Sequence, residues 1–156
     1  GVLAIFGSRL LNNRPPLIFE DGRQSRDFVH VRDVAAANVA ALESSKGDGL
    51  AMNVGAGVPR SILDIAASLA RVMGKRLEPK ILNDYRIGDI RHCIADNRLI
   101  RKTLGWSPRV VWEEGLAEYA DYIRRQKSTD RLSRAMTELA RRRLRRKTAP
   151  AADLKG

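Results

Sequence analysis

Apolar side chains recur every three or four residues in several stretches of the sequence, which is the spacing of an amphipathic helix. The clearest stripe starts at Ser61-Ile62-Leu63-Asp64, where Ser-x-x-Asp has the form of a capping box, and stops at Gly74. The same spacing predicts further helices over residues 2–13, 32–44, 97–104 and 112–123. These helices are spread along the chain and leave only short segments between them.

Short apolar or β-branched runs between the helices predict extended segments. We expect them over residues 17–19, 28–31, 50–54 and 77–82. The last of these contains Pro79, which cannot donate to a strand ladder, so an edge position is expected. Helices that alternate with short strands predict an α/β fold, with too few strands for a complete doubly wound domain.

Length and composition place the chain among globular proteins. It has 156 residues, 44% hydrophobic and 30% charged, and no apolar run approaches the roughly 18 residues of a membrane-spanning helix. The single cysteine, Cys93, excludes an internal disulfide and fits a reducing compartment, so we expect a cytoplasmic protein. The apolar start has no basic segment before it, so we expect a helix cut by a fragment boundary rather than a signal peptide.

The net charge of +11 comes mainly from a C-terminal tail, residues 128–156. This tail has nine Lys and Arg against three Asp and Glu, whereas residues 1–127 carry a net charge of only +5. Repulsion among the basic residues between Arg141 and Lys147 predicts a mobile, exposed tail, with at most a transient helix around residues 132–139. We therefore expect the domain to end at residue 127. The rival hypothesis is a basic module that binds nucleic acid or anionic lipid through the tail. A solvated charged helix explains the tail equally well.

Two arginines could bind phosphate. Arg26 follows the polar turn at residues 22–25, and Arg86 opens an Arg-Ile-Gly-Asp turn that ends at Asp89. A guanidinium is planar and permanently charged, and it can donate two parallel hydrogen bonds to phosphate oxygens. Taken alone, each arginine is more simply explained as a solvated surface charge.

Other polar residues have simpler explanations than catalysis. His30 lies between two valines and is expected to be a packed histidine, and Asp27 and Asp33 to bind local backbone or a cation. The pair His92-Cys93 is too small for a zinc site, which needs three or four ligands. The segment Gly55-Ala56-Gly57 lacks the third glycine of a dinucleotide fingerprint, so a turn is expected there.

Several segments together resemble one enzyme family over about residues 1–125. They are PPLIFEDGRQSRDFVHVRDVAAANVAAL, MNVGAG with RSILDIA, and RIGDIRHCIADNRLIRKTLGWSPRVVWEEGL. The chain resembles the C-terminal, substrate-binding portion of the extended short-chain dehydrogenases, namely the NAD-dependent nucleotide-sugar epimerases and dehydratases. It is similar to the UDP-galactose and dTDP-rhamnose 4-epimerase type, with a 4,6-dehydratase as the alternative.

The resemblance implies a site for a UDP- or dTDP-sugar. Arg26 and Arg86 would hold the diphosphate, and Asp89 would accept hydrogen bonds from ribose hydroxyls. Leu17 and Phe19 would lie beside the pyrimidine base through backbone groups. The complete enzyme would be a homodimer, and a nucleic-acid partner is not expected.

The resemblance also implies that much of the enzyme is absent from this sequence. No tyrosine has a lysine four residues on, and no glycine-rich turn for the NAD pyrophosphate is present. NAD would then be bound by a missing N-terminal half, and no catalytic, cofactor-binding or metal-binding residue is expected here. The fragment alone is not expected to catalyse, and a degenerate, inactive fragment is a further alternative. Apolar residues of segments 32–44 and 50–54 are expected to stay partly exposed, because they would pack on the missing half (Val34, Val39, Leu42, Leu50 and Met52).

Overall fold

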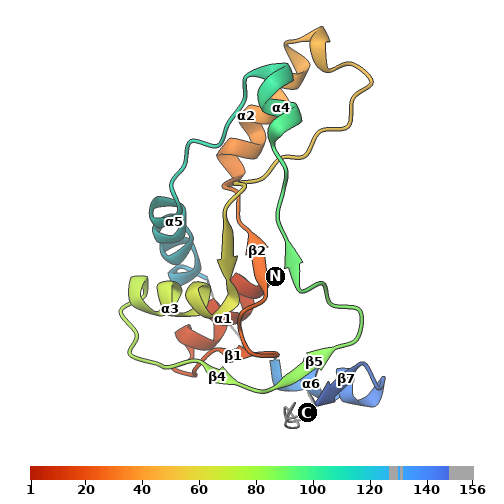
Figure 1. Ribbon diagram of the computed structural model, residues 1–156. Coiled ribbons are helices and arrows are strands. Elements are labelled where there is room, and N and C mark those ends of the chain that lie inside the picture. Colours follow the sequence, from red (N-terminus) through yellow and green to blue (C-terminus); the bar gives the residue numbers. More distant parts are fainter. Residues whose placement is uncertain (127–129, 131, 148–156) are drawn as a thin grey trace, which may run out of the picture.

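Helices and short strands are divided between two lobes in the computed structural model, which describes residues 1–126, 130 and 132–147 (Figure 1). The lower lobe in the figure contains α1 (Val2–Leu11), α3 (Ile62–Val72) and α5 (Trp112–Arg124). The upper lobe contains α2 (Val31–Leu42), the 3-10 helix η1 (Ser45–Gly47) and α4 (Arg98–Leu104). The predicted α/β class is therefore present, with each helix within a few residues of its expected position.

The lower lobe contains the main hydrophobic core. The stripe expected on α3 is buried against α1 and α5, and its first turn is capped as predicted, because the Asp64 amide donates to Ser61 Oγ at 3.0 Å. Helices α1 and α5 approach closely at Gly7, where an added Cβ would lie 2.5 Å from Ile123 Cδ1. The core residues of this lobe include Phe6, Leu10, Ile65, Leu69, Leu116 and Ala120.

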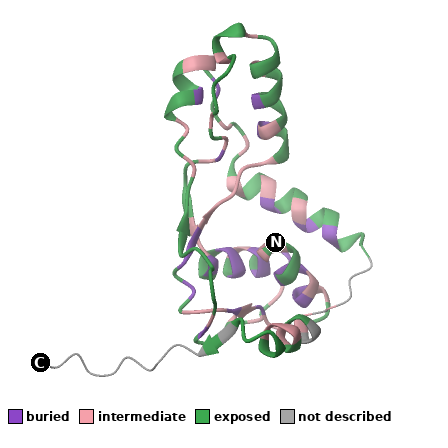
Figure 2. Ribbon diagram, turned by 90° about the vertical axis from the view of Figure 1, so that its right-hand side faces the viewer, coloured by how far each residue is buried: buried purple, intermediate pink, exposed green. Residues whose placement is uncertain are grey.

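The upper lobe has a smaller core made by α2, α4 and the loop that follows α4. Ala37, Ile100 and Trp106 are buried there, and the indole Nε1 of Trp106 donates to the Asp33 carbonyl at 3.1 Å. The Asp33 carboxylate accepts from the backbone amides of Arg109 and Val110, each at 3.0 Å. Asp33 is therefore a backbone partner, as the sequence predicts, but the backbone that it binds is distant in the chain rather than local. Most residues of this lobe are exposed rather than buried (Figure 2).

The strands are short and form three small sheets. β1 (Leu17–Ile18) pairs in parallel with β4 (Lys80–Ile81). β2 (Ser25–Asp27) lies between β3 (Pro59–Ser61), which is antiparallel to it, and β6 (His92–Cys93), which is parallel. β5 (Asp84–Arg86) pairs with β7 (Arg145–Lys147) in antiparallel orientation. Within the described residues these sheets have no more than three strands each, as expected for a chain without a complete doubly wound domain.

Two predicted extended segments differ from the structure. Residues 50–54 form no strand, and the strand expected at 28–31 lies earlier, at Ser25–Asp27, while Val31 already begins α2. Alternating apolar residues favour an extended backbone, but a strand exists only where a neighbour supplies ladder hydrogen bonds. β3 and β6 supply them to residues 25–27, and no described strand supplies them to residues 50–54.

The C-terminal tail is also more ordered than its charge predicted. The helix expected around residues 132–139 is present as α6 (Leu132–Arg141), and β7 returns to pair with β5. Charge repulsion favours a mobile tail, but attractive interactions oppose it. In the structure Glu138 accepts a hydrogen bond from Arg142 at 2.6 Å, and the backbone of β5 pairs with that of β7. The expectation for residues 148–156 lies outside the described residues. None of the described helices is both long and apolar enough to cross a membrane.

Candidate functional site

Arg26 is held in the centre of the three-stranded sheet, on β2. Its Nη1 donates to the carbonyls of Ser25 at 2.8 Å and Arg91 at 3.0 Å. Its Nη2 lies 3.5 Å from Asp89 Oδ1, at the long end of the hydrogen-bond range. The side chain is 26% exposed, so its guanidinium is fixed by backbone acceptors on one side and still open to solvent.

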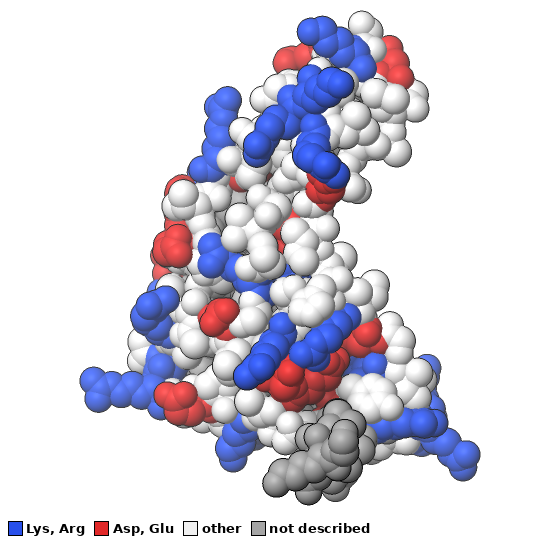
Figure 3. Space-filling model, in the orientation of Figure 1, with Lys and Arg blue, Asp and Glu red and all other residues white. Residues whose placement is uncertain are grey.

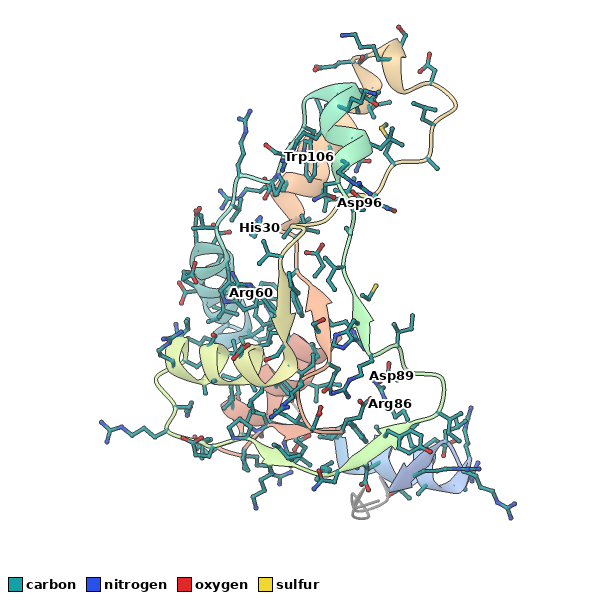
Figure 4. All side chains as sticks on the ribbon, viewed as in Figure 1. His30, Arg60, Arg86, Asp89, Asp96 and Trp106 are labelled. Carbon is teal, nitrogen blue, oxygen red and sulfur yellow. The ribbon has the colours of Figure 1, made fainter. Side chains whose placement is uncertain are left out.

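Arg86 approaches the same carboxylate from another strand. It ends β5, and its Nη2 donates to Asp89 Oδ2 at 2.8 Å (Figure 4). A tight turn between them brings Asp89 back toward Arg86: the Asp89 amide donates to the Arg86 carbonyl at 3.1 Å, and Gly88 has φ 82°. Only glycine adopts such a positive φ without a steric cost, which explains the Arg-x-Gly-Asp spacing. The arrangement places two guanidiniums on one carboxylate.

Phe19 completes this group, whereas Leu17 is joined to it only through the backbone of β1. The Arg86 guanidinium lies over the Phe19 ring, 5.4 Å from its centroid, a cation–π contact. The Phe19 carbonyl accepts from Gln24 Nε2 at 2.8 Å, which fixes the turn before Arg26. Leu17 is half-buried in β1, opposite Lys80. The structure thus brings together Arg26, Arg86, Asp89 and Phe19, from segments about 60 residues apart.

Three residues near this group were not predicted from the sequence. Arg91 donates to Glu20 at 2.6 Å and to Asp21 at 2.8 Å, and its carbonyl accepts from Arg26. The Arg91 guanidinium, helped by the Arg23 amide, holds the pKa of Asp21 below its ordinary value of 3.8. Ser25 Oγ lies 2.7 Å from Nδ1 of His92. These contacts join residues about 70 positions apart, so no local pattern could reveal them.

The glycine segment after residue 54 was predicted to be a turn, and the structure has a bend at Gly55 there, with irregular backbone on both sides. The Asp27 carboxylate accepts from the amides of Ala56 at 2.8 Å, Gly57 at 2.9 Å and Ala95 at 3.0 Å. The two amides of this segment that could face a phosphate are therefore already bound to a carboxylate. Asp27 is a backbone partner, which agrees with its predicted role.

An apolar cavity of about 740 Å³ lies elsewhere, against α5 and the start of α2. Arg60 lies over the Trp112 ring there at 4.6 Å from its centroid, and Phe28 meets the same ring edge-on at 5.6 Å. His30 is at its rim: Nδ1 accepts from the Arg32 amide and caps α2, and Nε2 lies 3.3 Å from Glu118. The predicted packed histidine is thus a helix cap. None of the five predicted site residues lines this cavity, so its size does not make it the site of the chemistry.

The site as built contains groups that can bind an anion. Among the residues that the structure describes, no three His, Cys, Asp or Glu side chains lie close enough to hold a metal ion. Two arginines on one aspartate, beside an aromatic ring and open to solvent, are suited to a ligand that carries phosphate. The fold and the site together therefore define an α/β protein with a candidate anion-binding site.

Comparison with known proteins gives the family. Residues 1–55 match the model of the NAD dependent epimerase/dehydratase family. A UDP-glucose 4-epimerase of Mycolicibacterium smegmatis is 40% identical over 124 residues, which are 80% of this chain and 39% of that protein. A dTDP-L-rhamnose 4-epimerase of Burkholderia thailandensis is 36% identical over 79% of this chain and 34% of its own length. Over about four fifths of its length the chain is therefore similar to members of the NAD-dependent epimerase/dehydratase family.

Solved structures agree with this assignment. The UDP-glucose 4-epimerase of Thermotoga maritima, crystallised with UDP-glucose, matches 80% of this chain with a TM-score of 0.73 and 38% identity. A UDP-N-acetylglucosamine 4-epimerase of Methanobrevibacter ruminantium, in complex with UDP-N-acetylmuramic acid, matches 81% with a TM-score of 0.74 and 31% identity. The chain spans 39% and 40% of these two proteins. The predicted resemblance and the α/β fold class are both confirmed. They apply to a portion that corresponds to about two fifths of each relative.

Proposed function

We propose that this chain is the C-terminal, nucleotide-sugar-binding portion of an NAD-dependent 4-epimerase. The observation that carries the proposal is the convergence of Arg26 with the Arg86–Asp89 turn, two segments about 60 residues apart, which places both guanidiniums on one carboxylate. Two cations this close repel each other, so the cluster needs a counterion. Asp89 supplies one negative charge, and the diphosphate of a nucleotide sugar supplies the rest.

Each residue has a distinct role in the proposed site. Arg26 and Arg86 bind the diphosphate, and Asp89 then accepts from the ribose hydroxyls. Phe19 and Leu17 lie beside the pyrimidine base through backbone groups, and the Phe19 ring holds the Arg86 guanidinium in place by the contact at 5.4 Å. A UDP-sugar agrees with the ligands bound to the solved relatives, and a dTDP-sugar with the rhamnose epimerase.

The proposed contribution of this portion is orientation of the substrate rather than bond chemistry. The family's NAD would supply hydride transfer in the complete enzyme, bound by a part of the protein outside this chain. Neither a glycine-rich dinucleotide fingerprint nor a Tyr-x-x-x-Lys pair occurs in these 156 residues. By anchoring the diphosphate, the arginines would keep the nucleotide fixed while the sugar is repositioned. We expect the chain alone to be inactive, and the complete enzyme to be a cytoplasmic homodimer.

Calorimetric titration with UDP tests the site on this chain. Loss of a charge-assisted contact predicts that Arg26→Ala and Arg86→Ala each weaken UDP binding by about 2–4 kcal/mol. Arg101→Ala is the matched control, since Arg101 is an exposed arginine on α4 in the upper lobe. The site assignment is wrong if both site variants bind UDP as the wild-type chain does.

Two of the three alternatives predicted from the sequence, the dehydratase and the basic binding module, have less support. A 4,6-dehydratase activity is named for part of a trifunctional relative in Arabidopsis thaliana, 32% identical over 72% of this chain, so product analysis of the complete enzyme decides between the reactions. On the face shown in Figure 3, basic side chains are interspersed with acidic ones, which does not favour a nucleic-acid surface. If the chain without residues 128–156 still binds UDP, even more weakly, a ligand site that belongs to the tail alone is excluded.

A further inference from the structure

The C-terminal tail is attached to the lower lobe at two places. The first is Asp130, whose side chain is only 4% exposed and accepts from Arg9 Nη1 at 2.9 Å and Arg14 Nη1 at 3.0 Å. The Leu132 amide also donates to Asp130, at 3.0 Å, where α6 begins. Burial opposes ionisation of this carboxyl, but the Leu132 amide and the two guanidiniums outweigh it and hold its pKa below 3.8. Breaking a buried ion pair is costly, so this attachment fixes the start of α6.

The second attachment is β7, which follows a sharp turn at the end of α6. Arg143 has φ 55°, and the Leu144 amide donates to the Leu139 carbonyl at 3.0 Å, as at a helix end with a left-handed residue. The chain then reverses, and β7 pairs with β5 in the register Arg86 opposite Arg145 and Tyr85 opposite Arg146. One more bond extends the pairing, because the Ile87 amide donates to the Leu144 carbonyl at 3.0 Å.

This pairing holds the segment that presents the candidate site. β5 carries Arg86, and the turn directly after it carries Asp89. Outside this pairing, the Glu20 amide donates to the Asp84 carbonyl at 2.7 Å, at the start of β5. Tyr85 and Arg86 are paired with the tail, and among the described strands β7 is the one that pairs with β5. A strand of three residues without such a partner is not stable in water. The position of the Arg86 guanidinium over Phe19 and on Asp89 therefore depends on a segment 60 residues further along the chain.

We propose that β7 is a positioning element of the nucleotide-diphosphate site: by pairing with β5 it fixes the backbone from which Arg86 and Asp89 bind the ligand. The inference rests on the proposed function, because it assigns the tail to that same site. It differs from the expectation of a mobile, exposed tail beyond a domain that ends at residue 127. Release of β7 should weaken binding of the diphosphate without unfolding the core of α1, α3 and α5.

Two substitutions at Arg143 distinguish the effect of the position of β7 from the effect of the Arg143 charge. Arg143→Gly and Arg143→Pro remove the same positive charge from an exposed residue. Glycine adopts the observed φ of 55° freely, whereas proline is fixed near −65° and also lacks the amide that donates to the Ala140 carbonyl. The glycine variant therefore keeps β7 in place, and the proline variant releases it. Asp130→Asn weakens the other attachment and gives an independent way to loosen the tail.

The experiment uses the 156-residue chain, UDP as the probe, and hydrogen exchange read by mass spectrometry. In Arg143→Pro we expect at least tenfold faster exchange in residues 84–89 and about tenfold weaker UDP binding, with exchange in α3 unchanged. Arg143→Gly should match the wild type in both exchange rates and in UDP affinity. Asp130→Asn should give values between those of the wild type and of Arg143→Pro.

Three results would overturn the inference. UDP affinity unchanged in the proline variant, although residues 144–147 exchange freely, would show that Arg86 does not need β7. Equal weakening in the glycine and proline variants would show that the charge of Arg143 acts on the ligand directly. If the wild-type chain binds no UDP, the proposed function itself is wrong and the inference falls with it.

Discussion

Gly55 is a point where three segments of the chain meet. Its backbone exchanges two hydrogen bonds with the Asn97 side chain, at 3.1 Å and 2.7 Å. An added Cβ would lie 2.4 Å from Ala95 Cβ and 2.4 Å from Asp27 Oδ2. Both neighbours are short side chains without freedom to move aside, and Asp27 also binds three backbone amides. The glycine at this position is therefore required by packing rather than by its backbone conformation.

We expect Gly55→Ala to destabilise the chain by about 1–3 kcal/mol, the usual cost of overpacking a filled site. Urea denaturation measures the free energy of unfolding. Gly47→Ala is the matched control: its Cβ would meet the flexible end of Met52 at 3.1 Å, so a loss below about 1 kcal/mol is expected. Equal losses in the two variants would contradict this account of Gly55.

At the scale of elements, α2 and the segment after it have apolar residues that stay partly or largely exposed. Val39 and Leu50 are each 50% exposed and Leu42 is 87% exposed, while Val34 and Met52 are half-buried. The sequence predicted that these five would stay partly exposed, and all five do. Residues 50–54 are also without a strand partner among the described strands, although their sequence favours an extended backbone. Both features fit a surface that another part of a longer enzyme covers.

Charged substitutions on α2 test this interpretation. Leu42→Lys should change the stability of this chain by less than about 0.5 kcal/mol, because the side chain is already exposed. In the complete enzyme the same change should cost about 2 kcal/mol or more, because it would bury a charge at a covered apolar surface. Thermal denaturation of both proteins makes the comparison, with Leu99→Lys on the exposed side of α4 as the control. An equally small effect in the complete enzyme would show that α2 remains uncovered.

At the scale of the whole molecule, the proposed separation of nucleotide-sugar binding from NAD binding can be measured. Arg26→Ala and Arg86→Ala in the complete enzyme should reduce affinity for the UDP- or dTDP-sugar, as in the isolated chain. NAD content should stay that of the wild type, because neither residue belongs to a dinucleotide-binding motif. Cofactor release by heat, followed by absorbance at 260 nm, gives the NAD content. Loss of NAD from either variant would contradict the separation of the two sites.

Local sequence patterns predicted much of the fold. The bounds of α1, α3 and α5 could be predicted to within a few residues. They depend on neighbours close in the sequence: the break at Pro15–Pro16, the apolar stripe behind Ser61 and the start of α5. Four of the five predicted site residues also lie together, but that prediction came from the resemblance of whole motifs. Spacing alone gave Arg26 and Arg86 no more than a role as surface charges.

Tertiary structure decided what depends on residues far apart in the chain. The sequence by itself determined the helices, the tight turn from Arg86 to Asp89 and the family, because each is encoded in contiguous residues. It did not determine that residues 50–54 remain unpaired, or that Arg91 supports Arg26. Nor did it determine that β7 pairs with β5, because a strand needs a partner and repulsion among arginines gives no sign of one. Hydrogen bonds between residues 60 to 70 positions apart form only when folding brings the two segments together.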